Sequence, residues 1–279
     1  MKKNIIVICM LLIAVTVSAH PGKMATYLDM ITGHKADFAS KTATFNDSTS
    51  IAVKRDTVTW IDTNRNRPVP VALYSANEKV TRTHFHGKQP LVILNPGYSG
   101  KNTDYSYIAT TLAKLGYYVV TVQHNLPADA PIPTVGNLYQ SRLPFWNAGV
   151  MNILFVIDRL KAIHPNLDHR HLILIGHSYG GDIVMLLAQQ HPQMVSAAIS
   201  LDNRRVPFPR NKHIRIFSIR SNDQIADPGV LPSLSEQRKY PISMVKVNTT
   251  HEDMGGFGTT QQLNEINHYI VAFLSGHTN

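Results

Sequence analysis

The residues best placed to do chemistry are 176–181, Gly-His-Ser-Tyr-Gly-Gly, which follow a short apolar run and precede a helix-like stretch. A serine between a strand and a helix needs small residues two places before and after it, because the backbone is strained there and neighbouring elements lie close. Gly176 and Gly180 meet this need. The pattern predicts a nucleophile elbow that exposes the Ser178 hydroxyl. It also predicts that the backbone N–H of Tyr179, at a helix N-terminus, faces a developing oxyanion.

Such a serine needs a base to take its proton and a carboxylate to orient that base. His251 is one of 14 histidines, but it combines a loop after the last predicted strand with a late position in the chain. In enzymes with a nucleophile elbow, the partners follow in the order serine, acid, histidine. The order therefore predicts His251 as the base for Ser178, against the simpler alternative of a solvated loop histidine.

Three aspartates compete for the place of the acid. Asp223 follows the penultimate predicted strand, 45 residues after Ser178 and 28 before His251, and is the favoured candidate. Asp202 ends the preceding predicted strand and comes second, while Asp227 lies deeper in a loop. Each of the three has the alternative role of forming a turn, and a strand-terminal aspartate can also anchor a loop or pair with a nearby arginine.

A second oxyanion donor is expected from the loop after the strand at 91–94. This loop reads Asn-Pro-Gly-Tyr-Ser-Gly over residues 95–100, a glycine-rich turn that can present backbone N–H groups. The backbone N–H of Tyr98 is the predicted partner of the Tyr179 N–H. Backbone donors of this kind stabilise the negative oxygen of a tetrahedral intermediate.

Alternating strands and helices must position these residues. Continuous apolar runs indicate parallel strands buried on both faces, and an N-terminal pair of runs indicates an antiparallel hairpin. The prediction is an α/β fold with a mostly parallel, doubly wound sheet whose ligands bind at the carboxyl ends of the strands. The predicted hairpin strands are 56–61 and 69–74, the further strands 91–94, 118–122, 172–175, 195–201, 214–219 and 242–247, and the helices 104–115, 148–160, 182–191 and 261–273.

Two connections bear on access to the site. Residues 123–147 form the longest predicted irregular segment, rich in proline and aromatic side chains, and either line a pocket or pack on the surface. Only residues 203–213 separate two late strands, so a large lid domain cannot fit there. We therefore expect an open site.

With these motifs in this order, the chain resembles the α/β-hydrolase superfamily over nearly all of its length after residue 19. The segment 62–74 and the Ser-Leu-Asp step that ends at Asp202 resemble the branch of dienelactone hydrolases and platelet-activating-factor acetylhydrolases. The resemblance implies an acid matching Asp202 in the acetylhydrolases and one matching Asp223 in most of the superfamily. The chain departs from dienelactone hydrolases in having Ser178 where they use cysteine, and it places Asp182 where small or apolar residues are usual.

The N-terminus has the features of a secretory signal peptide. Two lysines precede an apolar stretch from residue 5 to residue 15, and small residues at 17–19 predict cleavage after Ala19. The apolar run is shorter than the roughly 20 residues that a membrane anchor needs. The only cysteine, Cys9, lies within this signal, so the mature chain is predicted to have no disulfide and no thiolate zinc site.

The remaining chain suits one catalytic domain over residues 51–279, preceded by a polar lead-in over 20–50 to which no function is assigned. The formal net charge of +9 falls by two to +7 when Lys2 and Lys3 are removed with the signal. The basic residues are scattered along the chain and no nucleic-acid-binding motif accompanies them, which argues against nucleic acid as a partner. No spacing typical of a metal site accompanies the histidines, so we expect neither metal nor cofactor. These histidines are read as surface residues: His84, His86, His164, His169 and His171.

The sequence thus predicts a secreted, metal-independent serine hydrolase that cleaves carboxylic esters through an acyl-enzyme, in the periplasm or outside the cell. A small-molecule or lipid-like ester is the expected partner, and no stable membrane anchor is expected once the signal is removed. The alternatives are a peptidase or lipid acylhydrolase with the same triad, and a binding protein that keeps the fold without catalysis. The oligomeric state and the acyl length are left open.

Overall fold

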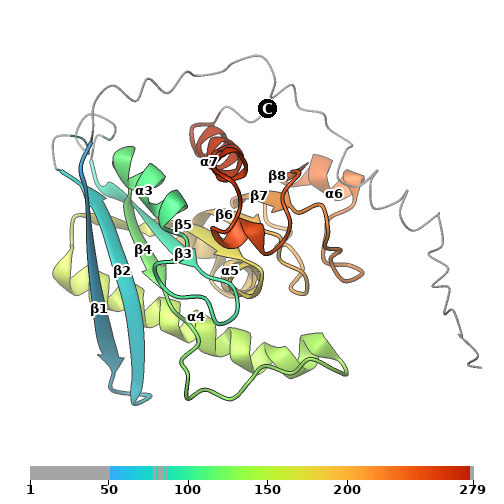
Figure 1. Ribbon diagram of the computed structural model, residues 1–279, viewed down its shortest axis with the longest axis horizontal. Helices are drawn as coiled ribbons and strands as arrows, with labels where there is room; N and C mark the ends of the chain where they lie inside the picture. The colour runs from blue at the N-terminus through green and yellow to red at the C-terminus, as the bar shows by residue number, and fades with distance from the viewer. Residues whose placement is uncertain (1–50, 78–79, 81–84, 86, 277–279) are drawn as a thin grey trace, which may run out of the picture.

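The computed structural model describes residues 51–77, 80, 85 and 87–276, and every structural statement below refers to these residues (Figure 1). The predicted signal peptide at 1–19 and the lead-in at 20–50 lie outside the described residues.

The described part of the chain forms one sheet of eight strands in the order β1-β2-β4-β3-β5-β6-β7-β8. β1 pairs antiparallel with β2, and β2 pairs antiparallel with β4. The six strands β4, β3, β5, β6, β7 and β8 run parallel to one another. The predicted α/β fold with an N-terminal antiparallel hairpin is therefore confirmed. The strands are β1 (Val53–Asp62), β2 (Arg67–Ala76), β3 (Gln89–Asn95), β4 (Tyr118–Val122), β5 (Leu167–His177), β6 (Val195–Leu201), β7 (Arg215–Arg220) and β8 (Ile242–Lys246).

Helices cover both faces of this sheet, with α3 and α7 on one side and α4 and α5 on the other (Figure 1). Their bounds are α3 (Ser106–Lys114), α4 (Leu138–Ile163), α5 (Tyr179–Gln190), α6 (Leu234–Lys239) and α7 (Thr260–Leu274), with short 3-10 turns η1 (Pro192–Met194) and η2 (Asp253–Gly255).

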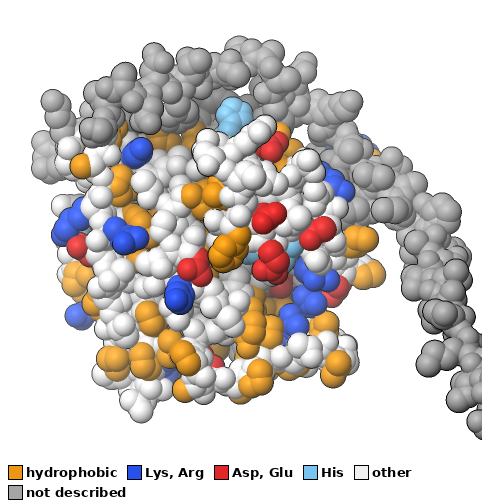
Figure 2. Space-filling model, viewed as in Figure 1, with side chains coloured by type: hydrophobic (Ala, Val, Ile, Leu, Met, Phe, Trp, Pro, Cys, Tyr) orange, Lys and Arg blue, Asp and Glu red, His pale blue; other side chains and the backbone are white. Residues whose placement is uncertain are grey.

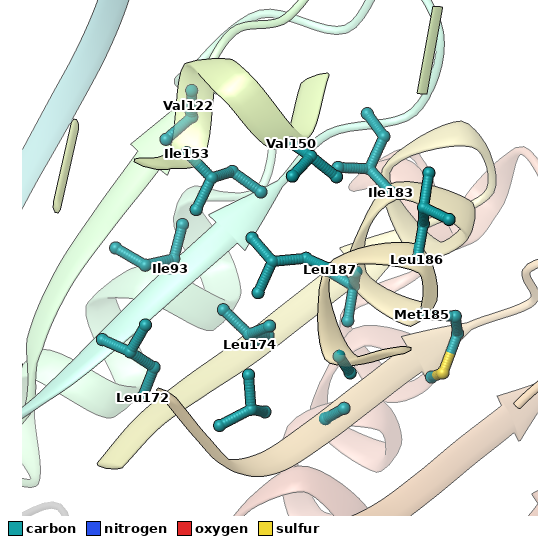
Figure 3. Close-up of a cluster of buried hydrophobic side chains, with 14 of the residues drawn as sticks. Ile93, Val122, Val150, Ile153, Leu172, Leu174, Ile183, Met185, Leu186 and Leu187 are labelled. Atoms are coloured by element: carbon teal, nitrogen blue, oxygen red, sulfur yellow. The ribbon is translucent and has the colours of Figure 1, made fainter. Parts of the chain in front are cut away.

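The central strand β5 shows why the apolar runs are continuous. Successive side chains of a strand point to opposite faces, and here both faces are covered. Leu172 and Leu174 pack with α4 and α5, as Figure 3 shows, whereas Ile173 and Ile175 belong to the cluster beneath α3 and α7. β5 is thus packed on both faces, and its last residue, His177, lies at the carboxyl edge of the sheet.

The helix α4 differs most from its predicted bounds, and α6 was not predicted. The helix expected at 148–160 begins ten residues earlier, at Leu138, so the irregular segment expected at 123–147 ends at Asn137. Pro144 lies inside the helix, and because proline is typical of loops, it favoured the prediction of an irregular segment there. A proline removes one backbone N–H donor, and the extensive packing of α4 against the core outweighs that loss. The Asn137 side chain caps the true start by accepting from Gln140 N at 3.2 Å.

The connection from β6 to β7, residues 202–214, contains no helix or strand, in agreement with the expected absence of a large lid. In the view of Figure 2, acidic and basic side chains gather side by side over the loops that follow β6, β7 and β8. Lys and Arg side chains on this face occur in separate groups and do not form one stripe. Within the described residues, no helix has both the length and the apolar character that crossing a membrane requires.

Candidate active site

The strand-to-helix turn at Ser178 is tight, and its glycines explain why. Ser178 has φ +51°, the left-handed region that residues with a side chain seldom adopt, and stands directly between β5 and α5. A Cβ on Gly176 would lie 2.3 Å from the backbone oxygen of Gly180, and one on Gly180 would lie 2.2 Å from that of Asn95. Side chains at these two positions would collide with the backbone, so the glycines let the turn form and hold Ser178 at its apex.

A chain of hydrogen bonds joins the serine to a histidine and an aspartate. His251 Nε2 lies 2.9 Å from Ser178 Oγ, and His251 Nδ1 lies 2.7 Å from Asp202 Oδ2. His251 follows β8, while Asp202 directly follows β6 with φ +58°. This left-handed turn directs its carboxylate toward the imidazole. The geometry matches a nucleophile, a base and an orienting acid.

The prediction that Asp223 contacts the imidazole is corrected by this geometry. Asp223 Oδ1 accepts a hydrogen bond from the backbone N–H of His251 at 2.7 Å, so it fixes the loop and does not touch the ring. Asp227 is no alternative, because its carboxylate faces Arg205 at 3.8 Å. The sequence alone could not decide among these aspartates, because all three lie in loops at the same edge of the sheet.

Buried groups keep the Asp202 carboxylate ionised. Arg220 Nη2 lies 2.7 Å from Asp202 Oδ1, and both side chains are fully buried. Ser221 Oγ donates to Asp202 Oδ2 at 2.6 Å. Burial alone would raise the pKa of Asp202, but the positive charge of Arg220 and the hydrogen bonds from His251 and Ser221 outweigh it and lower the pKa to about 2. Arg220 was not predicted from the sequence; its signal was a charged residue ending an apolar strand.

The two predicted oxyanion donors lie on adjoining segments. The Tyr98 ring packs edge-on against the Tyr179 ring, with centroids 5.8 Å apart. Within the described part of the chain, neither the Tyr98 nor the Tyr179 backbone N–H donates a hydrogen bond. The loop of Tyr98 is held on both sides of it, because Gly97 N donates to Tyr105 Oη at 3.1 Å and Ser99 N to Asn125 Oδ1 at 3.3 Å. Both N–H groups are thus without an acceptor among the described residues.

Comparisons with known proteins agree with this architecture. A family profile described as alpha/beta hydrolase fold matches residues 90–226. A solved structure of a dienelactone hydrolase-like promiscuous phosphotriesterase from metagenomic libraries superposes with a TM-score of 0.59 at 16% identity, covering 81% of this chain and 99% of that one. The chain has the α/β-hydrolase fold.

Curated relatives of this α/β-hydrolase are named as esterases. A probable 1-alkyl-2-acetylglycerophosphocholine esterase of Arthroderma benhamiae is 31% identical over 45% of this chain and 35% of its own length. Cutinase 2 of Thermobifida cellulosilytica is 30% identical over 44% of this chain and 41% of its own length. The similarity therefore spans well under half of the length of each of these relatives.

Asp182, the unusual residue after the elbow of this α/β-hydrolase, holds the loop that follows Asp202. Its Oδ1 accepts from the backbone N–H groups of Arg205 at 2.9 Å and Val206 at 2.8 Å, and its side chain is fully buried. Burial raises its pKa even though these hydrogen bonds act in the opposite direction. The carboxylate therefore has a positioning role, because it ties the first turn of α5 to the loop of the acid.

The histidines considered as metal ligands make separate contacts. His164 Nε2 meets the Tyr118 hydroxyl at 3.0 Å, and His169 Nε2 meets the backbone oxygen of His164 at 2.9 Å. His171 Nδ1 meets Asp168 Oδ2 at 2.9 Å. Among the residues that the structure describes, no three metal-ligating side chains gather at one point. His84 and His86 lie outside the described residues.

Two buried histidines predict a loss of stability in mild acid. Burial lowers the pKa of both His124 and His177 to about 3, with smaller contributions from neighbouring charges. The unfolded chain takes up protons on these histidines near pH 6.5, whereas the folded protein does so only near pH 3. The free energy of unfolding should therefore fall as the pH decreases through this window, by at most about 1.4 kcal/mol per pH unit for each histidine.

Urea denaturation at pH 7, 5.5 and 4.5 measures this slope. His124→Gln removes one titrating group and keeps a donor for Asn95 Oδ1, which lies 2.9 Å from His124 Nε2. The variant should lose part of the pH dependence above pH 4.5, where the carboxylates with lowered pKa remain ionised. An unchanged slope in His124→Gln would contradict the assignment.

Proposed function

We propose that this protein is a secreted serine hydrolase that cleaves carboxylic esters by acyl transfer. The observation that carries the proposal is the hydrogen-bonded chain from Ser178 through His251 to the buried Asp202. The similarity to relatives named as esterase and cutinase supports an ester as the substrate, either a small molecule or a lipid-like ester. Residues 51–279 are the proposed catalytic domain, and residues 1–19 the proposed signal that directs it to the periplasm or the exterior.

In the first half of the proposed reaction, Ser178 Oγ attacks the ester carbonyl while His251 Nε2 takes the hydroxyl proton. Asp202 holds the imidazole with its proton on Nδ1 and stabilises the imidazolium that forms. The negative oxygen of the tetrahedral intermediate accepts hydrogen bonds from the backbone N–H groups of Tyr98 and Tyr179. The intermediate then collapses, the bond to the alcohol breaks, and His251 gives its proton to the leaving oxygen.

In the second half, water replaces the alcohol. His251 takes a proton from this water, whose oxygen attacks the acyl carbon bound to Ser178. The second tetrahedral intermediate uses the same two donors, and its collapse releases the acid and returns the proton to Ser178. Every proton is accounted for within these residues, so the proposed cycle requires no cofactor.

Active-site labelling tests the proposal directly. The mature protein, residues 20–279, should react with a fluorophosphonate at a single serine, and peptide mass spectrometry should locate the adduct on Ser178. Ser196→Ala is a matched control, because Ser196 is hydrogen-bonded to the backbone of β5 at the far end of the sheet and should leave labelling unchanged.

A panel of p-nitrophenyl esters from acetate to palmitate, with a p-nitroanilide of the best acyl group, should show ester hydrolysis with a preferred acyl length. Faster cleavage of the anilide would favour a peptidase. A folded protein that neither labels nor turns over any ester would contradict the proposal and favour a binding protein.

A further inference from the structure

A second histidine, His177, lies directly before the nucleophile and forms a buried pair with Tyr105. His177 is the last residue of β5, and Tyr105 precedes α3. Their side chains meet at 2.6 Å between Tyr105 Oη and His177 Nδ1, and both residues are at least 95% buried. The reaction proposed above makes no use of either group, although a buried hydrogen-bonded pair of this kind needs a reason to be retained in a core.

The Tyr105 hydroxyl also contacts the oxyanion loop. The backbone N–H of Gly97 donates to Tyr105 Oη at 3.1 Å. A Cβ at Gly97 would lie 3.1 Å from His177 Nδ1 and 3.3 Å from Tyr105 Oη, so this loop packs against the pair as closely as its backbone permits. The residue after Gly97 is Tyr98, one of the two proposed oxyanion donors. The contacts of Gly97 with Tyr105 and His177 therefore restrict the position of the Tyr98 backbone N–H relative to the sheet.

These contacts fix where the protons lie. The Tyr105 oxygen accepts from Gly97 N–H, and its own hydrogen has one acceptor within reach among the described residues, His177 Nδ1. His177 Nδ1 is then the acceptor, and the ring proton lies on Nε2. Nε2 is buried and makes no hydrogen bond of normal geometry with the described residues. The backbone of His251 is the nearby polar group that favours the protonated form of the His177 ring.

The other side of the His177 ring faces the proposed base. The ring centroids of His177 and His251 are 4.6 Å apart, with the ring planes inclined by 44°. Burial, with the nearby charge of His251, lowers the pKa of His177 to about 3. His177 is therefore neutral at working pH. A neutral neighbour matters here, because a positive charge so close would oppose the imidazolium that His251 becomes in each half-reaction.

We propose that Tyr105 and His177 are positioning residues that hold the oxyanion loop at Gly97 and the base His251 in fixed places on either side of Ser178. The pair connects three segments of the site: the loop after β3, the elbow after β5 and the loop after β8. A change in the pair should therefore affect the transition state more than the binding of the ester. This inference rests on the proposed ester hydrolysis, because its effect is measured as a change in that reaction.

A double-mutant cycle on kcat and KM for p-nitrophenyl butyrate tests the proposal. Tyr105→Phe and His177→Leu should each lower kcat by about 10- to 50-fold with KM changed less than about threefold, because small displacements of catalytic groups cost rate. The double variant should be only slightly slower than either single variant, since both remove the same contact. His177→Asn should recover most of the rate, because its side-chain oxygen can accept from Tyr105 where Nδ1 did.

The fold supplies a matched control. Tyr118 and His164 form another tyrosine–histidine pair at 3.0 Å, at the opposite end of β4 and away from the site. Tyr118→Phe also removes a tyrosine hydroxyl that contacts a histidine. It should change the melting temperature by about as much as Tyr105→Phe does, while kcat remains unchanged. Full additivity in the cycle, or a kcat loss no larger in Tyr105→Phe than in Tyr118→Phe, would overturn the positioning role while leaving the ester hydrolysis itself intact.

Nitrogen-15 NMR of the histidines provides a readout that does not depend on turnover. The wild-type protein should show His177 neutral between pH 5 and 8 with the proton on Nε2, and Tyr105→Phe should alter the chemical shift of Nδ1. A charged His177 in this range, or a proton on Nδ1, would contradict the proposal. A wild-type protein with the expected NMR spectrum but no ester hydrolysis would refute the proposed function instead.

Discussion

Replacement of Ser178 by alanine is expected to abolish ester hydrolysis, lowering kcat by roughly 10⁶-fold, the size of the loss when a serine protease loses its nucleophile. The alanine leaves His251 and Asp202 in place but gives them no hydroxyl to activate, so no acyl-enzyme can form. Residual rate should come only from the oxyanion donors and from binding. The measurement is the steady-state rate with p-nitrophenyl butyrate, together with the loss of fluorophosphonate labelling.

This variant should fold as well as the wild-type protein. The Ser178 hydroxyl is hydrogen-bonded only to His251 among the described residues, and alanine meets the same backbone strain at φ +51° that serine does. The melting temperature should therefore stay within a few degrees. A folded Ser178→Ala protein that retains a tenth of the wild-type rate would show that another group is the nucleophile.

The fold could be predicted from the sequence because its strongest signals are local. The central parallel strands contain continuous apolar runs that are buried on both faces, and strands such as β4 and β6 have the predicted bounds. The start of α4 could not be predicted in this way. Pro144 and the polar residues of its first turns resemble a loop, and only packing against the sheet makes that segment helical.

The contact between Ser178 and His251, the proposed nucleophile and base, could be predicted because chain order and strand ends constrain these two residues strongly. The acid could not, because the choice depends on the direction in which a short side chain points after its strand. The left-handed backbone of Asp202 and its contact with Arg220 are tertiary facts that spacing does not encode. The Tyr105–His177 pair was missed for the same reason, since its two residues are 72 positions apart in the chain.

Asp202→Asn is expected to be the second most damaging change, lowering kcat by about 10³- to 10⁴-fold with p-nitrophenyl butyrate. Asp202 Oδ2 accepts a hydrogen bond from His251 Nδ1–H at 2.7 Å, which leaves Nε2 unprotonated and able to act as the base. An asparagine that donates its amide to Nδ1 would fix the opposite tautomer, with the proton on Nε2. It would also remove the negative charge that stabilises the imidazolium, and both effects act on the chemical step.

Asp223→Asn is the matched control for this prediction. The side chain keeps an oxygen that can accept from the backbone N–H of His251, its contact at 2.7 Å, so the rate should fall by no more than about tenfold. A larger loss in Asp223→Asn than in Asp202→Asn would return the acid role to Asp223.

Stability must be followed in parallel, because Asp202→Asn leaves the fully buried Arg220 without its carboxylate partner. Breaking a buried ion pair on one side costs about 3–5 kcal/mol, so the variant should melt well below the wild-type protein. Rates therefore have to be compared at a temperature where both proteins are folded. Circular dichroism measures the fraction of each protein that is folded at that temperature. The rate can then be divided by the concentration of folded protein, so that a loss of folding is not mistaken for a loss of catalysis. We attribute a decrease in kcat that remains after this correction to the changed tautomer of His251 and to the loss of the negative charge that stabilises its imidazolium.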